Sequence, residues 1–147
     1  MGEITNRIME FRNKYTGGVA WRVKKHAQVL EEYINPDEKV LYAFCGQKNE
    51  KFNEIFNTYA IAVTNKRIIM GRKRLMFGSF FSTITPDLYN DMQIYRGLIW
   101  GKITIDTVKE IVVLTNLPKK SLDEIETTIS EFMMEAKKKY KNEQKDK

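Results

Sequence analysis

Between residues 39 and 115 the sequence contains seven short segments with the composition of β-strands and no stretch of helical periodicity. These segments are rich in β-branched and aromatic residues, and turn-forming residues separate them. They span residues 39–45, 57–64, 67–72, 76–83, 92–96, 102–106 and 110–115. Because consecutive strands without intervening helices pair antiparallel, we expect one antiparallel sheet that closes or packs on itself.

The clearest hairpin lies at residues 59–73, YAIAVTNKRIIMGRK, where the polar pair Asn65-Lys66 joins two apolar runs. A two-residue connection between apolar runs is how tight β-hairpins are built. Asparagine tolerates the positive φ that such a turn needs, so we expect Asn65 in that conformation. The pair therefore predicts an antiparallel hairpin.

Helical periodicity is confined to the two ends of the chain. An N-terminal stripe of apolar residues ends near Tyr15, and a second stripe runs through residues 21–34. Residues 116–118 predict a break after the last strand, and Ser121 with Glu124 predicts a capping box. The stripe that follows consists of Leu122, Ile125, Ile129, Phe132, Met133, Ala136 and Tyr140. We expect a C-terminal helix of roughly five turns that covers the open end of a barrel.

Residue types that carry chemistry are scarce. The single cysteine, Cys45, excludes an internal disulfide framework, and with the single histidine, His26, it cannot build a common zinc site. His26 lies near no nucleophile motif, and Cys45 is interpreted as a small buried hydrophobe. Asp87, Asp91 and Asp106 lack a spacing that marks an acid–base pair. We expect a non-enzyme with no catalytic residue, metal, cofactor or small-molecule substrate.

The charge pattern suggests a division of the chain. The formal net charge is +6, and residues 137–147 hold six lysines against two acidic residues, which gives +4. Such a tail usually serves solubility. We expect an N-terminal helical segment at 1–36, the main domain at 37–141 and a basic flexible tail at 142–147. No apolar run approaches the ~20 residues of a membrane span and no signal-peptide region is present, which favours a cytoplasmic location.

Four local motifs follow one another in a characteristic order. They are TNKRIIM at 64–70, MFGS at 76–79, PDLYNDMQI at 86–94 and GLIWGKITI at 97–105. In this order and spacing, the chain resembles bacterial pleckstrin-homology (PH) domains of the YokE-like type over residues 39–132. The resemblance implies a mainly β fold with α: a PH-like, seven-stranded antiparallel split barrel capped by a C-terminal α-helix. One or two N-terminal helices precede this barrel.

The resemblance also implies a cytoplasmic protein without known catalytic function, of a kind that often serves in interaction or oligomerisation. Eukaryotic relatives bind phosphoinositides through basic residues in the first loop between strands. Here that loop, QKNEKFNE, balances Lys48 and Lys51 against Glu50 and Glu54. We therefore do not expect binding of a lipid headgroup by this loop.

A basic segment extends from residue 55 to residue 85, where no acidic residue occurs. Its five cations, which are candidates for anion contact, are Lys66, Arg67, Arg72, Lys73 and Arg74. Five residues of strand span roughly 16 Å, so they form two patches at opposite ends of one strand. Three interpretations stay open: solvated turn residues, contact with an anionic membrane or nucleic acid, and pairing with acids elsewhere.

An apolar triplet, Leu98, Ile99 and Trp100, lies between two glycines at a predicted hairpin tip. Turn tips are usually polar, because exposing such side chains to water is unfavourable. Either the tip folds against the barrel or an N-terminal helix, or it is presented to a second subunit or a membrane. The same alternatives apply to residues 75–77.

Phe80 and Phe81 are adjacent on a predicted strand and must face opposite sides of the sheet. One of them can lie in a core only if a helix covers the outer face. The N-terminal helices also need a surface for their apolar stripe. We favour docking of these helices on the sheet exterior at Phe80 or Phe81 over a role in self-association.

These observations favour a non-catalytic interaction module. Protein–protein contact or homo-oligomerisation would use strand addition at unpaired barrel edges and the tip at residues 98–100. The alternative is peripheral attachment to an anionic membrane, with Ile99 and Trp100 in the interface and basic side chains on the headgroups. Nucleic acid is a weaker candidate, because aromatic and basic residues are not interleaved as stacking platforms require.

Overall fold

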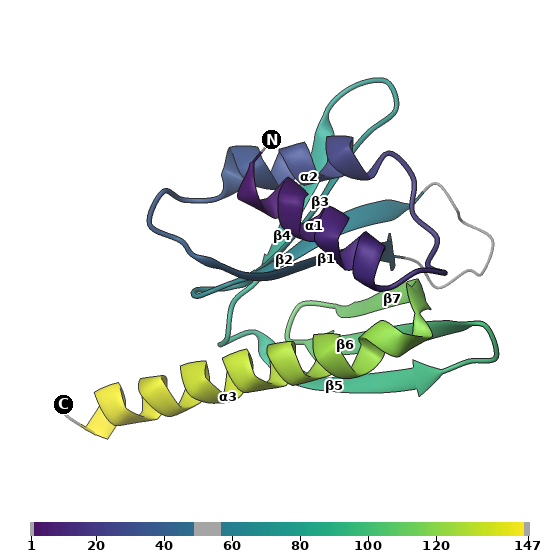
Figure 1. The fold of residues 1–147 in the computed structure, drawn as a ribbon. Coiled ribbons are helices and arrows are strands. Elements are labelled where there is room, and N and C mark those ends of the chain that lie inside the picture. Colours follow the sequence, from purple (N-terminus) through teal and green to yellow (C-terminus); the bar gives the residue numbers. More distant parts are fainter. Residues whose placement is uncertain (1, 49–56, 146–147) are drawn as a thin grey trace.

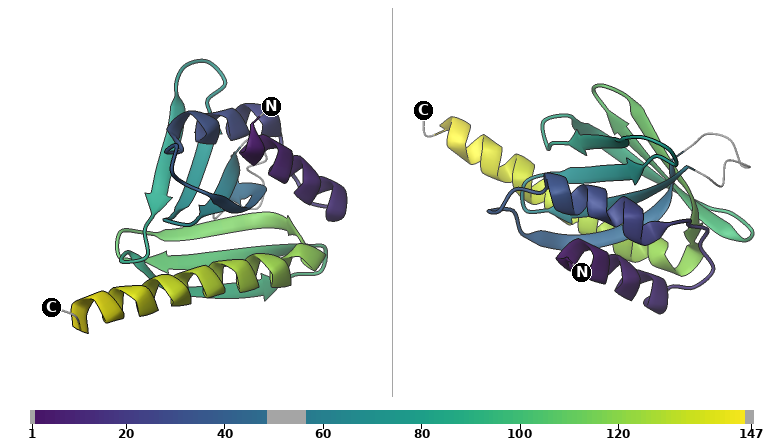
Figure 2. Two further views of the ribbon diagram at one scale, coloured as in Figure 1. Left: turned by 60° about the vertical axis from the view of Figure 1, so that its left-hand side comes forward. Right: turned by 90° about the horizontal axis from the view of Figure 1, so that it is seen from above.

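The computed structural model describes residues 2–48 and 57–145. Within these ranges, seven strands form one antiparallel sheet, as expected from the sequence (Figure 1). Their order across the sheet is β4-β3-β2-β1-β7-β6-β5. The strands are β1 (Val40–Lys48), β2 (Thr58–Thr64), β3 (Ile68–Lys73), β4 (Ser79–Ile84), β5 (Tyr89–Arg96), β6 (Trp100–Thr107) and β7 (Ile111–Pro118). The sheet bends into a half-barrel, with β1–β4 in one half and β5–β7 in the other (Figure 2).

The described ranges also contain three α-helices, which are α1 (Glu3–Lys14), α2 (Val23–Tyr33) and α3 (Leu122–Lys145). α1 lies over β1, and α2 lies over β2 and β3 (Figure 1). α3 follows β5 and β6 on the opposite side of the molecule, and its last turns project beyond the sheet (Figure 2). No helix in the described part of the chain combines the length and the apolar character needed to cross a membrane.

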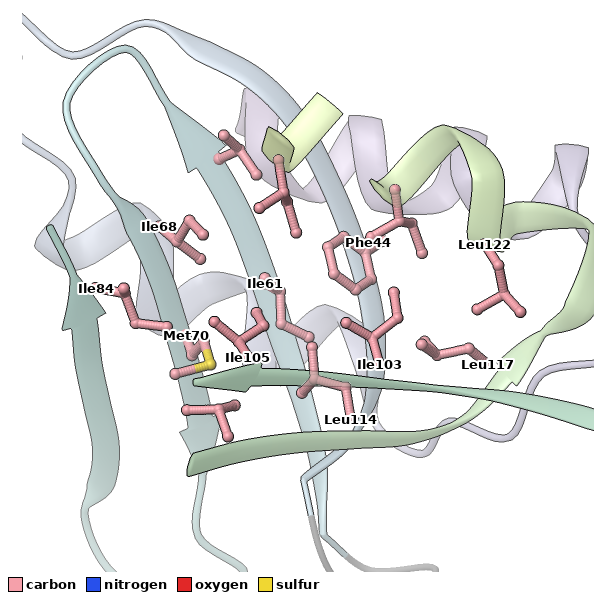
Figure 3. Close-up of a cluster of buried hydrophobic side chains, with 14 of the residues drawn as sticks. Phe44, Ile61, Ile68, Met70, Ile84, Ile103, Ile105, Leu114, Leu117 and Leu122 are labelled. Carbon is pink, nitrogen blue, oxygen red and sulfur yellow. The ribbon is translucent and has the colours of Figure 1, made fainter. Parts of the chain in front are cut away.

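The inner core fills the concave side of the half-barrel. Figure 3 shows Phe44, Ile61, Ile103 and Leu114 meeting there from strands of both halves. α3 closes this core with four buried residues, Leu122, Ile125, Ile129 and Met133. Burial of side chains of this size stabilises the fold by roughly 1.5–3 kcal/mol each. The C-terminal helix therefore covers the open end of the sheet, as predicted.

A second core lies on the outer face, between the sheet and the two N-terminal helices. Many of the outward-facing strand residues are small, namely Ala43, Cys45, Ala60, Ala62 and Gly71, although Val40, Ile69 and Phe81 on the same face are larger. A Cβ at Gly71 would lie 2.8 Å from Leu30 Cδ2 and 3.0 Å from Val29 Cγ1 of α2. The small residues thus let the helices approach the sheet closely, which confirms the docking that the sequence favoured.

The start of β4 was placed too early from the sequence. Residues 76–78 belong to the β3–β4 turn, where the Arg74 N–H donates to the Gly78 carbonyl at 3.1 Å. Gly78 has a φ of +77°, a conformation that favours glycine. The turn therefore ends at Gly78, and β4 begins at Ser79.

The predicted break at residues 116–118 is also wrong. These residues continue β7, where Leu117 pairs with Gly101 and is fully buried. Asn116 takes a φ of 57°, and the register shifts beside it between Gly101 and Ile103. A β-bulge thus lets the strand run on through a residue type that usually ends strands.

Two predictions of local geometry are corrected. Asn65 lies in the predicted β2–β3 turn but does not have a positive φ; its side chain instead accepts the Lys39 N–H at 2.8 Å. The capping box is absent as well, because the Ser121 hydroxyl donates to the Pro118 carbonyl at 2.6 Å. Glu124 instead accepts hydrogen bonds from the Lys14 ammonium and the Tyr42 hydroxyl, both at 3.0 Å. At Asn65 and Glu124, long-range contacts thus replace the local ones that the sequence suggested.

The C-terminal helix is longer than expected. α3 continues to Lys145, so residues 142–145 of the predicted flexible tail are helical. These four residues are exposed, but they are helical and not an unstructured chain.

Candidate interaction surfaces

The β5–β6 tip, defined here as Leu98 and Ile99, is held in place by its neighbours. The exposed fractions of these two side chains are 94 % and 64 %. Trp100 folds back, and its Nε1–H donates to the Gly17 carbonyl at 2.8 Å. Both interpretations of the apolar triplet therefore apply, to different residues: Trp100 packs on the chain after α1, whereas Leu98 and Ile99 face solvent.

The β4 edge is the outer rim of the first half of the sheet. β4 pairs with β3 on one side, and no described strand pairs with its other side. Its sequence, SFFSTI, contains no charged residue and no proline. Phe80 is 47 % exposed at this edge, directly across from Arg72.

Phe80 and Phe81 face opposite sides, as predicted. Phe81 lies on the outer face, where it stacks on Tyr33 of α2 with ring centroids 4.5 Å apart. Phe81 is therefore a docking residue for α2 and is not available to an external partner. Phe80 stays available, with the Arg74 guanidinium 5.4 Å from its ring.

The two basic patches differ sharply in their partners. Arg67 forms an ion pair with Glu38, whose side chain is completely buried, at 2.7 Å. Lys66 is bonded to Asp37. Both cations are thus engaged by acids of the chain, and the prediction that they contact an external anion loses support. Hydrogen bonds from Arg67 and Thr64 outweigh the effect of burial and lower the pKa of Glu38.

The second patch lies at the β3–β4 hairpin. Arg72, Lys73 and Arg74 end β3, and the turn after them exposes residues 75–77. The Lys73 N–H donates to His26 Nδ1 at 2.8 Å, which places the first turn of α2 beside the hairpin. Arg22, Lys24 and Lys25 of that first turn were not recognised as site residues from the sequence. The sequence feature that could have identified them is the absence of any acidic residue in the first turn of α2, because acidic residues are favoured at a helix N-terminus.

His26 and Cys45 are buried titratable residues, and burial favours the uncharged form of each. Burial, with the charges of Arg22 and Arg72, lowers the pKa of His26 to about 4. Burial raises the pKa of the Cys45 thiol to about 12, so it stays protonated at neutral pH. Among the described residues, no group of three or more His, Cys, Asp or Glu side chains is arranged to hold a metal ion.

The first loop between strands was predicted from the sequence to carry no net charge and to bind no lipid headgroup. β1 continues through Lys48, three residues beyond the predicted strand end, and residues 49–56 lie outside the described residues. Lys48 forms an ion pair with Glu110 at 3.5 Å.

A seven-stranded antiparallel half-barrel closed by a C-terminal helix is the architecture of PH-like domains, a class of interaction modules that is generally non-catalytic. The family model described as Bacterial PH domain matches residues 34–131. This match covers more than half of the chain, so the protein belongs to the bacterial PH domain family. The YokE-like subtype stays a prediction.

Two solved structures are similar to this chain. A DUF1696 family protein with a pleckstrin-homology domain from Shewanella loihica is 15 % identical, with a TM-score of 0.51 over 80 % of this chain and 97 % of that chain. A pleckstrin homology domain from Shewanella amazonensis is 16 % identical, with a TM-score of 0.49 over 84 % and 98 %. At this identity the first likeness supports the fold alone. No curated protein matches the chain.

Proposed function

We propose that this chain is a protein-binding module that adds a partner strand to its β4 edge, and that a second copy of the chain is the simplest partner. The observation that carries the proposal is the composition of Ser79–Ile84, an edge strand with neither charge nor proline. An edge strand leaves a row of backbone N–H and C=O groups unpaired, and another chain can pair with them.

The opposite edge shows how this chain protects a strand. β5 carries Asp91 and Arg96, and the Lys137 ammonium of α3 donates to the Tyr89 carbonyl at 3.0 Å. Charges and a covering helix are common defences against unwanted strand pairing. β4 carries no charge, and α2 contacts it through Phe81 on the outer face of the sheet, which supports a binding role for the β4 edge in preference to β5.

A second copy would satisfy the β4 edge with two-fold symmetry. Two β4 strands aligned antiparallel would each contribute the same residues, as isologous interfaces require. Phe80, half-exposed at this edge, would supply apolar contact. The β5–β6 tip is a second candidate for protein contact, because Leu98 and Ile99 are exposed on a well-anchored hairpin.

Light scattering on the intact chain over a concentration series tests the proposal. We expect a mass above the 17.3 kDa of one chain for the wild type. Phe80→Glu should weaken association by about tenfold or more, because a carboxylate would have to be buried in the new interface. The hairpin itself should tolerate this change, since the carboxylate would face Arg72 across the strand pair.

Val108→Glu is the matched control, because Val108 is also exposed, at 66 %, but lies in the β6–β7 turn and not on β4. A wild type that stays a monomer at the highest concentration would overturn self-association. Membrane attachment through Ile99 and Trp100 is a weaker alternative, because the Trp100 ring is bonded to Gly17.

A further inference from the structure

A second apolar apex lies on the other exposed hairpin of the chain. The β3–β4 tip, defined as Leu75, Met76 and Phe77, has exposed fractions of 67 %, 82 % and 79 %. The turn is closed by the bond from Arg74 to Gly78, directly above the Lys73–Ser79 pair. Figure 1 shows this hairpin projecting past the start of α2. Three adjacent apolar side chains in water are unfavourable and mark a contact surface.

Cations surround the base of this tip. This basic collar consists of Arg22, Lys24, Lys25, Arg72, Lys73 and Arg74. Half of it comes from α2 and half from β3 and its turn, and the bond from Lys73 to His26 joins the two halves. In the part of the chain that the structure describes, no collar residue forms an ion pair with a carboxylate. The collar is therefore a concentrated, uncompensated positive charge.

The positive surface extends beyond the collar into the space between α1 and α2. An open groove of about 290 Å³ lies there, lined by Met9, Arg12, Arg22, Val23, Lys24 and Lys25. Arg12 adds a further exposed cation. The N-terminal end of α2, the positive end of its dipole, lies at the same place. The charge thus extends over a surface broad enough to face many anionic groups at once.

We infer that the β3–β4 tip and the basic collar dock this chain on the surface of an anionic lipid bilayer. The apolar apex enters the boundary between headgroups and acyl chains, while the collar meets lipid phosphates and carboxylates. α2 precedes the residues that the family model matches, so half of the collar is a feature of this chain. The surface also differs from the β5–β6 tip.

The shape and chemistry of the tip decide between partners. Nucleic acid would use the cations, but Phe77 alone among the three tip residues offers a ring on which a base can stack, so Leu75 and Met76 would stay in water. A protein partner would have to supply both a desolvated pocket for the apex of this projecting hairpin and acidic groups for the cations around its base. A bilayer accepts a convex apolar apex and pairs with the cations around it, so it fits both parts of the surface.

Co-sedimentation of the intact chain with vesicles tests the inference. The vesicles are phosphatidylcholine alone, or phosphatidylcholine with about 30 % phosphatidylserine. We expect binding that requires phosphatidylserine and weakens with salt. Lys25→Gln with Lys73→Gln should weaken binding about 25-fold, from roughly fivefold for each charge. Met76→Ser with Phe77→Ser should weaken it by at least about tenfold.

Matched controls separate this surface from general effects. Lys138→Gln with Lys139→Gln removes the same charge from exposed positions on α3, and Leu98→Ser removes an equally exposed apolar residue from the other hairpin. Neither control should weaken binding by more than about twofold. All substituted residues are exposed, and circular dichroism verifies the fold of each variant.

Insertion has its own readout in Phe77→Trp. After subtraction of the wild-type emission, which comes from Trp21 and Trp100, the emission of the new tryptophan should shift to the blue with anionic vesicles and not with neutral ones. The inference fails if the wild type does not sediment with anionic vesicles at low salt, or if the α3 control weakens binding as much as the collar variant. Binding to a DNA duplex that needs the collar but not the tip would assign nucleic acid instead. Self-association is measured without lipid, so the two proposals can fail separately.

Discussion

The backbone N–H of Lys73 donates a 2.8 Å hydrogen bond to Nδ1 of His26. This bond joins the end of β3 to the first turn of α2, and His26 is 3 % exposed. Nδ1 can accept only while the imidazole is neutral. Burial and the charges of Arg22 and Arg72 keep it neutral by lowering the pKa of His26 from 6.5 to about 4.

The lowered pKa of His26 predicts a loss of stability in mild acid. The folded-state pKa lies below the unfolded one, so as pH falls from 6.5 toward 4 the unfolded chain takes up a proton that the folded chain does not. The free energy of unfolding should fall by about 3 kcal/mol across this window. Urea titrations at several pH values measure it.

His26→Asn is the matched variant for this prediction, because its amide oxygen can still accept the Lys73 N–H but does not titrate. Its stability should be nearly constant between pH 6.5 and 5. The pKa values of Glu38 and Glu124 are lowered from 4.5, so their titration changes the free energy of unfolding mainly below pH 4.5 and leaves the range from pH 6.5 to 5 to His26. An equally steep loss in the variant would refute the assignment to His26.

The Arg67–Glu38 pair should contribute far more to stability than the neighbouring Lys66–Asp37 pair. The Glu38 side chain is 0 % exposed and that of Arg67 is 18 %, whereas the side chains of Lys66 and Asp37 are 47 % and 68 % exposed. Arg67→Met leaves a buried carboxylate without its cation, which should cost about 3–5 kcal/mol. Lys66→Met should cost less than about 1 kcal/mol. Chemical denaturation measures the free energy of unfolding of both variants. Equal losses of stability would contradict the claim that burial makes the Arg67–Glu38 pair the more important one.

The sheet and the C-terminal lid were predictable because each leaves a local period in the sequence. Ile61 and Val63 alternate with Ala60 and Ala62 in β2, and the stripe on α3 recurs at helical spacing. The same alternation carried a second signal, since small residues at every other strand position indicate a helix packed closely on that face. The outer core could therefore have been predicted with the inner one.

The basic collar could not be assembled from the sequence. Lys25 and Lys73 are brought to one surface by the docking angle of α2, and no local pattern encodes that angle. Arg67 and Glu38 pair for the same reason, across 29 positions. Where local predictions failed at Asn65 and Glu124, a long-range partner replaced the local one.

Gly101→Ala should destabilise the fold from within the inner core. A Cβ at this position would lie 2.4, 2.6 and 2.8 Å from three side-chain atoms of Leu122, which is fully buried at the start of α3. Overpacking of this kind costs about 1–3 kcal/mol. Leu122→Ala should remove the clash, so the double variant should be more stable than the sum of the two single losses predicts. Additive losses in thermal denaturation would disprove this close approach.

Trp100→Phe should loosen the chain between α1 and α2 while it leaves the barrel folded. The change keeps a ring but removes the donor to the Gly17 carbonyl, and loss of one such bond costs about 1 kcal/mol. The nearby Val19 N–H, which donates to the Asn116 carbonyl at 3.0 Å, should exchange with solvent faster. Leu98 lies two positions before Trp100 and is 94 % exposed, so Leu98→Ala should change neither the stability of the fold nor the exchange rate of the Val19 N–H. Unchanged exchange at Val19 would mean that Trp100 does not restrain this segment.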